Sequence, residues 1–252
     1  MEKVLNPTVC FFDSGIGGLC LLYECVRKLP DVDFVYFADN ENVPYGSLDK
    51  NTLITKVDEI FLRIQNLNPS AVVVACNTVT ANCIDYLRNK YKFDIIGIQP
   101  AVKPASKQGG KCLVLATPAT SKSEALTELI KKFGNGNMEI FANENLASYI
   151  ENHIDELNYS DIVKLLPQKR FDSVVLGCTH YIFIKDIVKS FYKCPVFDGI
   201  EGTADHLCEK LGKNDHRGKR AQKITFSGGF EYKNRGIFRK LISEKGISAL
   251  NK

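Results

Sequence analysis

The chain has 252 residues, of which 44% are hydrophobic and 25% are charged, and its formal net charge at pH 7 is +4. This composition is typical of a globular protein with one large core or two smaller ones. The small net charge gives no reason to expect a nucleic-acid partner, and no run approaches the roughly 18 apolar residues of a membrane span. Residues 1–4 lead directly into a strand-like segment without a signal-peptide core, so we expect a cytoplasmic protein.

The nine cysteines include no C-x-x-C pair, as expected of thiols in a reducing compartment. Most of them fall within predicted helices or strands, and we interpret these as core residues: Cys10, Cys20, Cys25, Cys83, Cys112 and Cys208. The most basic run, Lys213–Lys223, is interpreted as a solvated loop.

Short apolar runs alternate with amphipathic segments in the first part of the chain. Strands are expected at 9–12, 34–38, 72–75 and 95–98. Helices are expected at 19–29, where Pro30 ends the helix, at 53–67, and from the third strand to about residue 89. The proline-containing segment Gln99–Pro104 interrupts this alternation.

The alternation then restarts. Strands are expected at 112–116, 139–142, 174–177 and 195–197, and helices at 123–133, within 145–166, at 183–191 and at 201–211. A last strand at 223–226 and a helix at 237–243 follow. This order predicts an α/β protein with two similar doubly wound parallel-sheet lobes and an active site in the cleft between them. We assign residues 1–98 plus 212–252 to the first lobe and 99–211 to the second.

Two cysteines follow matching buried strands. One apolar run ends in A-C-N-T at 75–78, and the other ends in G-C-T-H at 177–180. Because ligands bind beyond the carboxyl ends of the strands in open α/β sheets, Cys76 and Cys178 lie where chemistry is expected. Each cysteine also precedes a predicted helix, whose positive N-terminal end should lower the thiol pKa from its usual ~8.5.

A third polar loop, D-S-G-I-G-G at 13–18, follows the first strand and opens a helix. It lacks the third glycine of a dinucleotide fingerprint, because position 20 is Cys. Its glycines still let a ligand approach the backbone, and the N–H groups at the start of a helix suit a carboxylate. Asp13, at the end of the strand, is interpreted either as a site residue or as a helix N-cap.

Two thiols that face one substrate suit the inversion of a carbon centre. One group removes a proton from one face, the other delivers a proton to the opposite face, and the roles exchange in the reverse direction. A zinc site needs more ligands at short spacing than Cys178 and His180 supply, and a protease-type Cys–His pair leaves one thiol unused. No cofactor signature accompanies the thiols, so we expect neither a cofactor nor a metal.

In combination, these motifs, with A-D at 38–39, P-Y-G at 44–46 and Tyr181, resemble the cofactor-independent glutamate racemases of the aspartate/glutamate racemase family. The resemblance covers nearly the whole chain and implies interconversion of L- and D-glutamate for peptidoglycan synthesis, by a homodimer. It implies that Cys76 and Cys178 are the acid/base thiols, with Asp13 beside the first and His180 and Glu151 assisting the second. The substrate-binding residues that it implies are Asp13, Ser14, Tyr45, Gly46, Asn77, Thr78, Thr117, Thr120, Thr179 and His180.

The sequence departs from the family pattern at a few positions. The apolar, proline-containing run that usually precedes the family's glutamate here reads N-E-N-L-A-S-Y-I, before Glu151. Ile182 replaces a usual proline and Ala116 a usual glycine, and we expect both to alter packing rather than mechanism. His180 favours glutamate, because related racemases for aspartate usually carry Glu there. The alternatives are aspartate racemisation on the same scaffold and a two-lobed module that binds an acidic amino acid without turnover.

Overall fold

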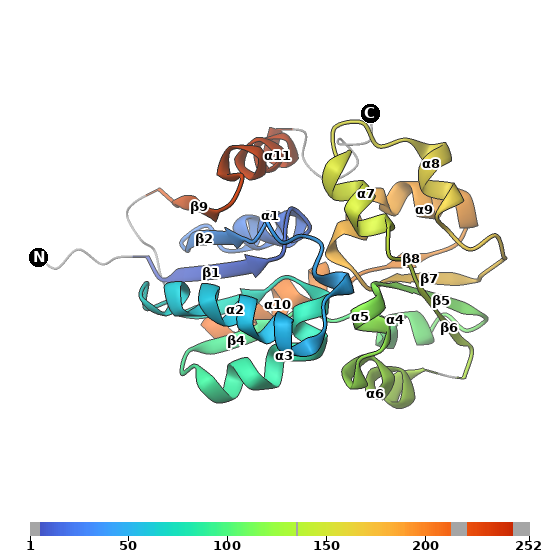
Figure 1. Cartoon of the computed structure of the whole chain (residues 1–252), viewed down its shortest axis with the longest axis horizontal. Helices are drawn as coiled ribbons and strands as arrows, with labels where there is room; N and C mark the ends of the chain where they lie inside the picture. The colour runs from blue at the N-terminus through green and yellow to red at the C-terminus, as the bar shows by residue number, and fades with distance from the viewer. Residues whose placement is uncertain (1–5, 135, 213–220, 244–252) are drawn as a thin grey trace, which may run out of the picture.

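Two parallel β-sheets, each flanked by helices, form the protein (Figure 1). The computed structural model describes residues 6–134, 136–212 and 221–243. The first sheet has the order β4-β3-β1-β2-β9, and the second has the order β6-β5-β7-β8. The strands of the first sheet are β1 (Thr8–Asp13), β2 (Asp33–Ala38), β3 (Ala71–Val74), β4 (Asp94–Gly97) and β9 (Ile224–Gly228). Those of the second are β5 (Cys112–Ala116), β6 (Met138–Ala142), β7 (Ser173–Leu176) and β8 (Val196–Phe197). The predicted α/β architecture is confirmed.

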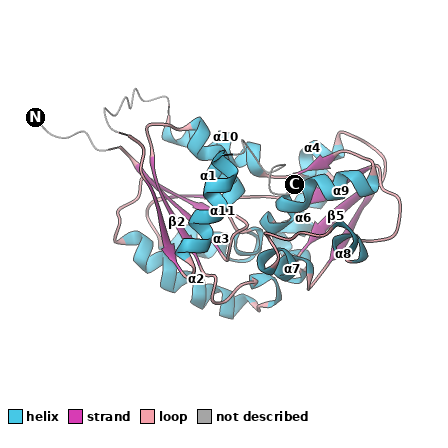
Figure 2. Cartoon of the chain, turned by 90° about the horizontal axis from the view of Figure 1, so that it is seen from above, coloured by secondary structure: helices cyan, strands magenta, loops and turns pink. Residues whose placement is uncertain are grey.

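Helices cover both faces of each sheet, which Figure 2 shows from above. The helices that pack on the first sheet are α1 (Leu19–Lys28), α2 (Lys50–Gln65), α3 (Asn77–Lys90), α10 (Ile200–Leu211) and α11 (Glu231–Ser243). Those of the second lobe are α4 (Val102–Ser106), α5 (Pro118–Ser121), α6 (Glu124–Phe133), α7 (Leu146–Asn152), α8 (Tyr159–Lys164) and α9 (Lys185–Tyr192). Two short 3₁₀ helices, η1 (Tyr45–Ser47) and η2 (Thr179–Ile184), complete the elements of the described residues.

Alternating side chains of a strand pack into different hydrophobic cores on the two faces of its sheet. In β1, Val9 and Phe11 face one core, while Cys10 and Phe12 face the other, as the two-residue period of a strand requires. The first of these cores is continuous across the molecule, because it also contains Leu113 of the second sheet. The two lobes therefore share buried apolar surface beside the strand ends that carry the polar loops.

Several elements differ from the sequence-based expectation. Cys178 is followed directly by η2 rather than by an α-helix, which begins only at Lys185. Helix α11 begins at Glu231, six residues before the predicted start. The five-residue helix α4 begins within the proline-containing segment that was expected to interrupt the alternation, and it ends at Ser106. Most of the basic run predicted to be a loop, residues 213–220, lies outside the described residues, as do residues 1–5, 135 and 244–252.

Strand pairing and helix contacts indicate where the two lobes divide. Strand β9 pairs with β2, so the last described strand belongs to the first sheet. Helix α10, which the sequence pattern assigned to the second lobe, packs against α1 and β4. We therefore propose that the chain returns to the first lobe before Ile200 rather than at residue 212. No helix among the described residues is long and apolar enough to cross a membrane.

Candidate active site

The two cysteines stand at equivalent places in the two sheets. Cys76 follows β3, next to β1, and Cys178 follows β7, next to β5. In each sheet the second strand along the chain pairs on one side of the first, and the third pairs on its other side. The topological switch points therefore lie between β1 and β3 and between β5 and β7. Ligands of open α/β sheets bind at such points, beyond the carboxyl ends of the strands. The topology therefore places both thiols at the positions where each lobe is built to bind a ligand.

Polar contacts join the loop after β1 to both cysteine-bearing loops, one within the first lobe and one across the lobes. The Cys76 thiol lies 3.8 Å from the Ser14 hydroxyl oxygen. Thr179, next to Cys178, donates to Oδ2 of Asp13 at 3.1 Å. A Cβ at Gly17 would lie 2.5 Å from Oγ1 of Thr179, so only glycine permits this approach of the loops. The loop after β1 thus contacts the surroundings of both thiols.

Cys178, His180 and Glu151 form a buried row of side chains in contact. The Cys178 sulfur lies 3.9 Å from Nδ1 of His180, and Nε2 of His180 lies 2.8 Å from Oε2 of Glu151. The backbone N–H of Ile16 also donates to Oε2, at 3.0 Å. Glu151 is only 4% exposed, although the sequence before it departs from the family pattern. The structure therefore places Glu151 beside His180, and its assistance to Cys178 stays a prediction.

The electrostatics favour an ion pair between a protonated His180 and an ionised Glu151. Burial opposes ionisation of both groups, but their mutual hydrogen bond and attraction lower the pKa of Glu151 to about 2. Burial also opposes protonation of His180, yet contacts with Cys178 and Glu151 raise its pKa well above the ordinary value. A protonated His180 places a positive charge beside the Cys178 sulfur.

The environment of Cys76 is different. Burial, followed by the negative charge of Asp13, raises the pKa of the Cys76 thiol, and the Cys178 thiol adds to the shift. The N–H of Val79 and the Ser14 hydroxyl do lower the pKa of Cys76, but burial raises it by more. The expectation that the start of α3 gives Cys76 a lowered pKa is therefore wrong. Burial also raises the pKa of Asp13 from 3.8 to about 7. Asp13 therefore changes its protonation state near neutrality, beside Cys76.

Three hydroxyls from both lobes form a buried triangle. Thr78, in the first turn of α3, lies 3.0 Å from Thr117 and 3.3 Å from Thr120 (oxygen to oxygen), and Thr117 donates to Thr120 at 2.9 Å. The amide nitrogen of Asn77 is buried and has no hydrogen-bond partner among the described residues. These groups are donors suited to a carboxylate.

The segment with Tyr45 and Gly46 packs on this triangle from the first lobe. A Cβ at Gly46 would lie 2.6 Å from Cβ of Thr117, so the 3₁₀ helix η1 approaches the second lobe closely. The Tyr45 hydroxyl, however, donates to Asp39, so it is already paired. Tyr45 thus supports the Asp39 loop in this structure.

Asn40, Lys233 and Asn234 were missed by the sequence analysis. Asn40 donates to Oε1 of Glu151 at 3.1 Å, and Lys233 lies 3.6 Å from the same oxygen. Asn234 donates to Asn40 at 2.8 Å. One signal was available: Asn234 lies at the spacing of the buried apolar positions of α11, where a polar residue is unusual.

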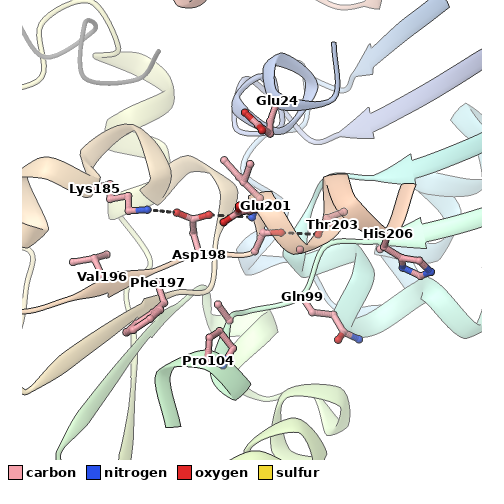
Figure 3. A pocket seen from close by; sticks show the side chains of 15 residues that line it. Glu24, Gln99, Pro104, Lys185, Val196, Phe197, Asp198, Glu201, Thr203 and His206 are labelled. Carbon is pink, nitrogen blue, oxygen red and sulfur yellow. Dashed lines mark hydrogen bonds and ion pairs between the residues drawn. The ribbon is translucent and has the colours of Figure 1, made fainter. Parts of the chain in front are cut away.

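A cavity of about 750 Å³ lies elsewhere, at the two places where the chain passes between the lobes (Figure 3). Gln99 and Gly199 line it, and a Cβ at Gly199 would lie 2.3 Å from the Gln99 carbonyl oxygen. Lys185 and Asp198 form an ion pair at its edge, at 2.6 Å. Among its lining residues, none belongs to the predicted site. The two thiols, rather than this cavity, therefore define the candidate active site.

Two α/β lobes with a thiol at each switch point define a class of two-lobed racemases. The Asp/Glu/Hydantoin racemase family model matches residues 24–207, and the chain belongs to this family.

Relatives and solved structures agree with this assignment. The chain is 41% identical over 224 residues to a glutamate racemase of Clostridium novyi, covering 84% of this chain and 86% of the relative. It is 35% identical to glutamate racemase 2 of Bacillus subtilis, covering 86% of each. A crystal structure of Escherichia coli glutamate racemase, in complex with L-glutamate and the activator UDP-MurNAc-Ala, superposes with a TM-score of 0.81 at 26% identity, covering 96% of each chain. The resemblance stated from the sequence is confirmed.

Proposed function

We propose that this protein is a glutamate racemase that interconverts L- and D-glutamate, supplying D-glutamate for peptidoglycan synthesis. One observation carries the proposal: two cysteines from different lobes stand at equivalent switch points, joined through the Asp13–Thr179 contact. The names of the relatives support glutamate as the substrate. His180 supports the same choice, since the resemblance associates a Glu at this position with aspartate.

In the proposed reaction the two thiols act on opposite faces of Cα. The Cys76 thiolate takes the α-proton of D-glutamate, so the Cα–H bond breaks and an S–H bond forms. The electron pair left on Cα is delocalised into the α-carboxylate, and the Cys178 thiol then donates its proton to the opposite face. L-Glutamate reacts by the same steps in reverse, with Cys178 as the base.

The surroundings of each thiol suit these roles in different ways. Asp13, with its pKa raised to about 7, removes the repulsive charge beside Cys76 whenever it is protonated. His180, held by Glu151, provides a positive charge beside Cys178. The two sulfurs therefore have different charged neighbours, and in a reversible two-base reaction each of them acts as base in one direction and as acid in the other.

We assign the substrate carboxylates to the buried donors around the thiols. These donors are the hydroxyls of Ser14, Thr78, Thr117, Thr120 and Thr179, together with the unpaired amide nitrogen of Asn77. Cys76 is 5% exposed and Cys178 is 6% exposed, so glutamate enters when the loops of the two lobes separate. Closure then excludes water from the acidic α-carbon.

The proposal is tested by incubating the purified protein with each enantiomer of glutamate and of aspartate, and following optical rotation. We expect rotation to decay with both enantiomers of glutamate and to change far more slowly with aspartate. Cys76→Ser and Cys178→Ser should each abolish net inversion. Faster conversion of aspartate would show an aspartate racemase, and tight glutamate binding without inversion would show a binding module.

Two further properties are proposed, of which the first rests on the resemblance alone. We propose a homodimer, which light scattering after size-exclusion chromatography would test. We also propose a cytoplasmic location, and fractionation of cells would test it.

A further inference from the structure

The Glu151 carboxylate is shared between the two lobes. Its Oε2 atom faces His180 of its own lobe and the N–H of Ile16, as described above. Its Oε1 atom accepts from Asn40 at 3.1 Å and lies 3.6 Å from Nζ of Lys233, and both of these residues belong to the first lobe. Lys233 also donates to the backbone carbonyl oxygen of Glu151 at 2.7 Å. The two carboxylate oxygens therefore have separate partners, and among the described residues Oε1 contacts only groups of the first lobe.

The contacts on Oε1 are themselves held in place by α11. Asn234 is 1% exposed and donates to Oδ1 of Asn40 at 2.8 Å. Asn40 in turn has its amide nitrogen on Glu151 and its oxygen on Asn234, which fixes the orientation of its amide group. Lys233 and Asn234 are adjacent in the first turn of α11. One helix turn thus supplies a charge to Glu151 directly and a hydrogen bond through Asn40.

We propose that Lys233 and Asn40 are positioning residues for Cys178: they hold the Glu151 carboxylate in the orientation in which it aligns His180 on the sulfur, and Asn234 aligns Asn40. This inference rests on the proposed two-thiol racemase function. The charge of Lys233 also favours the ionised form of Glu151, which is the form that pairs with a protonated His180. Asp13 also interacts electrostatically with His180 and Glu151, and a substitution in α11 does not remove it.

A local role at Cys178 has a distinctive kinetic consequence. The enantiomers of glutamate have equal free energies, so kcat/KM must be the same in both directions for every variant. The two kcat values are not tied in this way. Because the ratio of the two kcat values depends on the relative proton affinities of the two thiols, a change beside Cys178 alters it. A loss of folded protein lowers both kcat values by the same factor and leaves their ratio unchanged.

The experiment compares Lys233→Met with Lys240→Met, using the intact protein and both enantiomers of glutamate. Lys240 is on the same helix and forms an exposed ion pair with Asp155 of the second lobe, so its replacement removes the same charge and another contact between the lobes. Lys233→Arg keeps the charge and the donors, and Asn40→Asp places a like charge against Glu151 without changing the shape of the side chain.

For Lys233→Met we expect kcat/KM to fall about tenfold in both directions and kcat to fall about threefold more with L-glutamate, whose proton Cys178 removes. Asn40→Asp should shift the ratio in the same direction, Lys233→Arg should restore most of it, and Lys240→Met should leave it unchanged. Unchanged kinetics, an equal fall of both kcat values in Lys233→Met, or an equal shift of the ratio in Lys240→Met would overturn the inference. A wild-type protein that does not racemise glutamate would overturn the proposed function instead.

Discussion

Asp13→Asn changes the charge of the site with little change in shape. Asp13 is fully buried, and its two oxygens accept from the N–H of Gly15 at 2.8 Å and from the hydroxyl of Thr179 at 3.1 Å. An asparagine keeps both contacts, because its oxygen accepts from Gly15 and its amide nitrogen donates to the oxygen of Thr179. Its effect on stability therefore reports the cost of the buried charge.

The size and sign of that cost follow from the pKa of Asp13. Burial raises the pKa from 3.8 to about 7, so between these values the folded protein binds more protons at this group than the unfolded chain does. The stability that Asp13 contributes is therefore lost as the pH rises through this window. At 1.36 kcal/mol per pKa unit, the penalty above pH 7 is about 4 kcal/mol. Asp13→Asn avoids it, so its free energy of unfolding should exceed that of the wild type at neutral and alkaline pH.

The assay is urea unfolding of both proteins at a series of pH values. The advantage of Asp13→Asn should grow by about 2.5 kcal/mol between about pH 5 and about pH 8, while racemisation is lost. Asp186→Asn, which removes an exposed carboxylate at the start of α9, should show a difference that does not vary in this way. A constant difference for Asp13→Asn, or a loss of stability that grows with pH, would refute the reasoning.

Three other changes test the geometry of the site. Gly15→Ala places a Cβ 2.3 Å from Oε2 of Glu151, so we expect kcat/KM to fall by about 10- to 100-fold, whereas Gly202→Ala, whose Cβ meets nothing within 4 Å, should retain activity and melt at a slightly higher temperature. Equal activity of the two alanine variants would show that Glu151 is not needed in this position. His180→Gln should lower kcat by about 100-fold in steady-state assays, and a normal kcat would remove it from the mechanism. Thr78→Val should raise KM about tenfold with a smaller effect on kcat, since it removes a donor to the substrate, and an unchanged KM would count against this assignment.

The placement of the thiols was predictable because it follows from strand order and polarity. Buried runs that end in A-C-N-T and G-C-T-H indicate strands of parallel sheets, and the carboxyl ends of such strands are where ligands bind. The contact between Cys76 and Ser14 follows from the pairing of β1 with β3. The family resemblance added the roles of His180 and Glu151, which local patterns alone do not give.

The remaining features depend on long-range packing. Asn40 and Glu151 are 111 positions apart, and Lys233 and Glu151 are 82 apart, so no local pattern relates them. The raised pKa of Cys76 was not predicted, because desolvation depends on the complete burial of the site and outweighs the start of α3. The packing of α10 on the first lobe likewise depends on its contacts with α1 rather than on its place after β8.

The central claim is that a different thiol acts on each face of Cα, and early-time deuterium incorporation tests it most directly. L-Glutamate is incubated with the protein in D₂O, and both enantiomers are separated before much conversion has occurred. Because the donating thiol exchanges its proton with solvent, the D-glutamate formed should carry deuterium at Cα, while the remaining L-glutamate should carry almost none. D-Glutamate that retains the original hydrogen would show that one group removes and returns the same proton, which contradicts the two-thiol account.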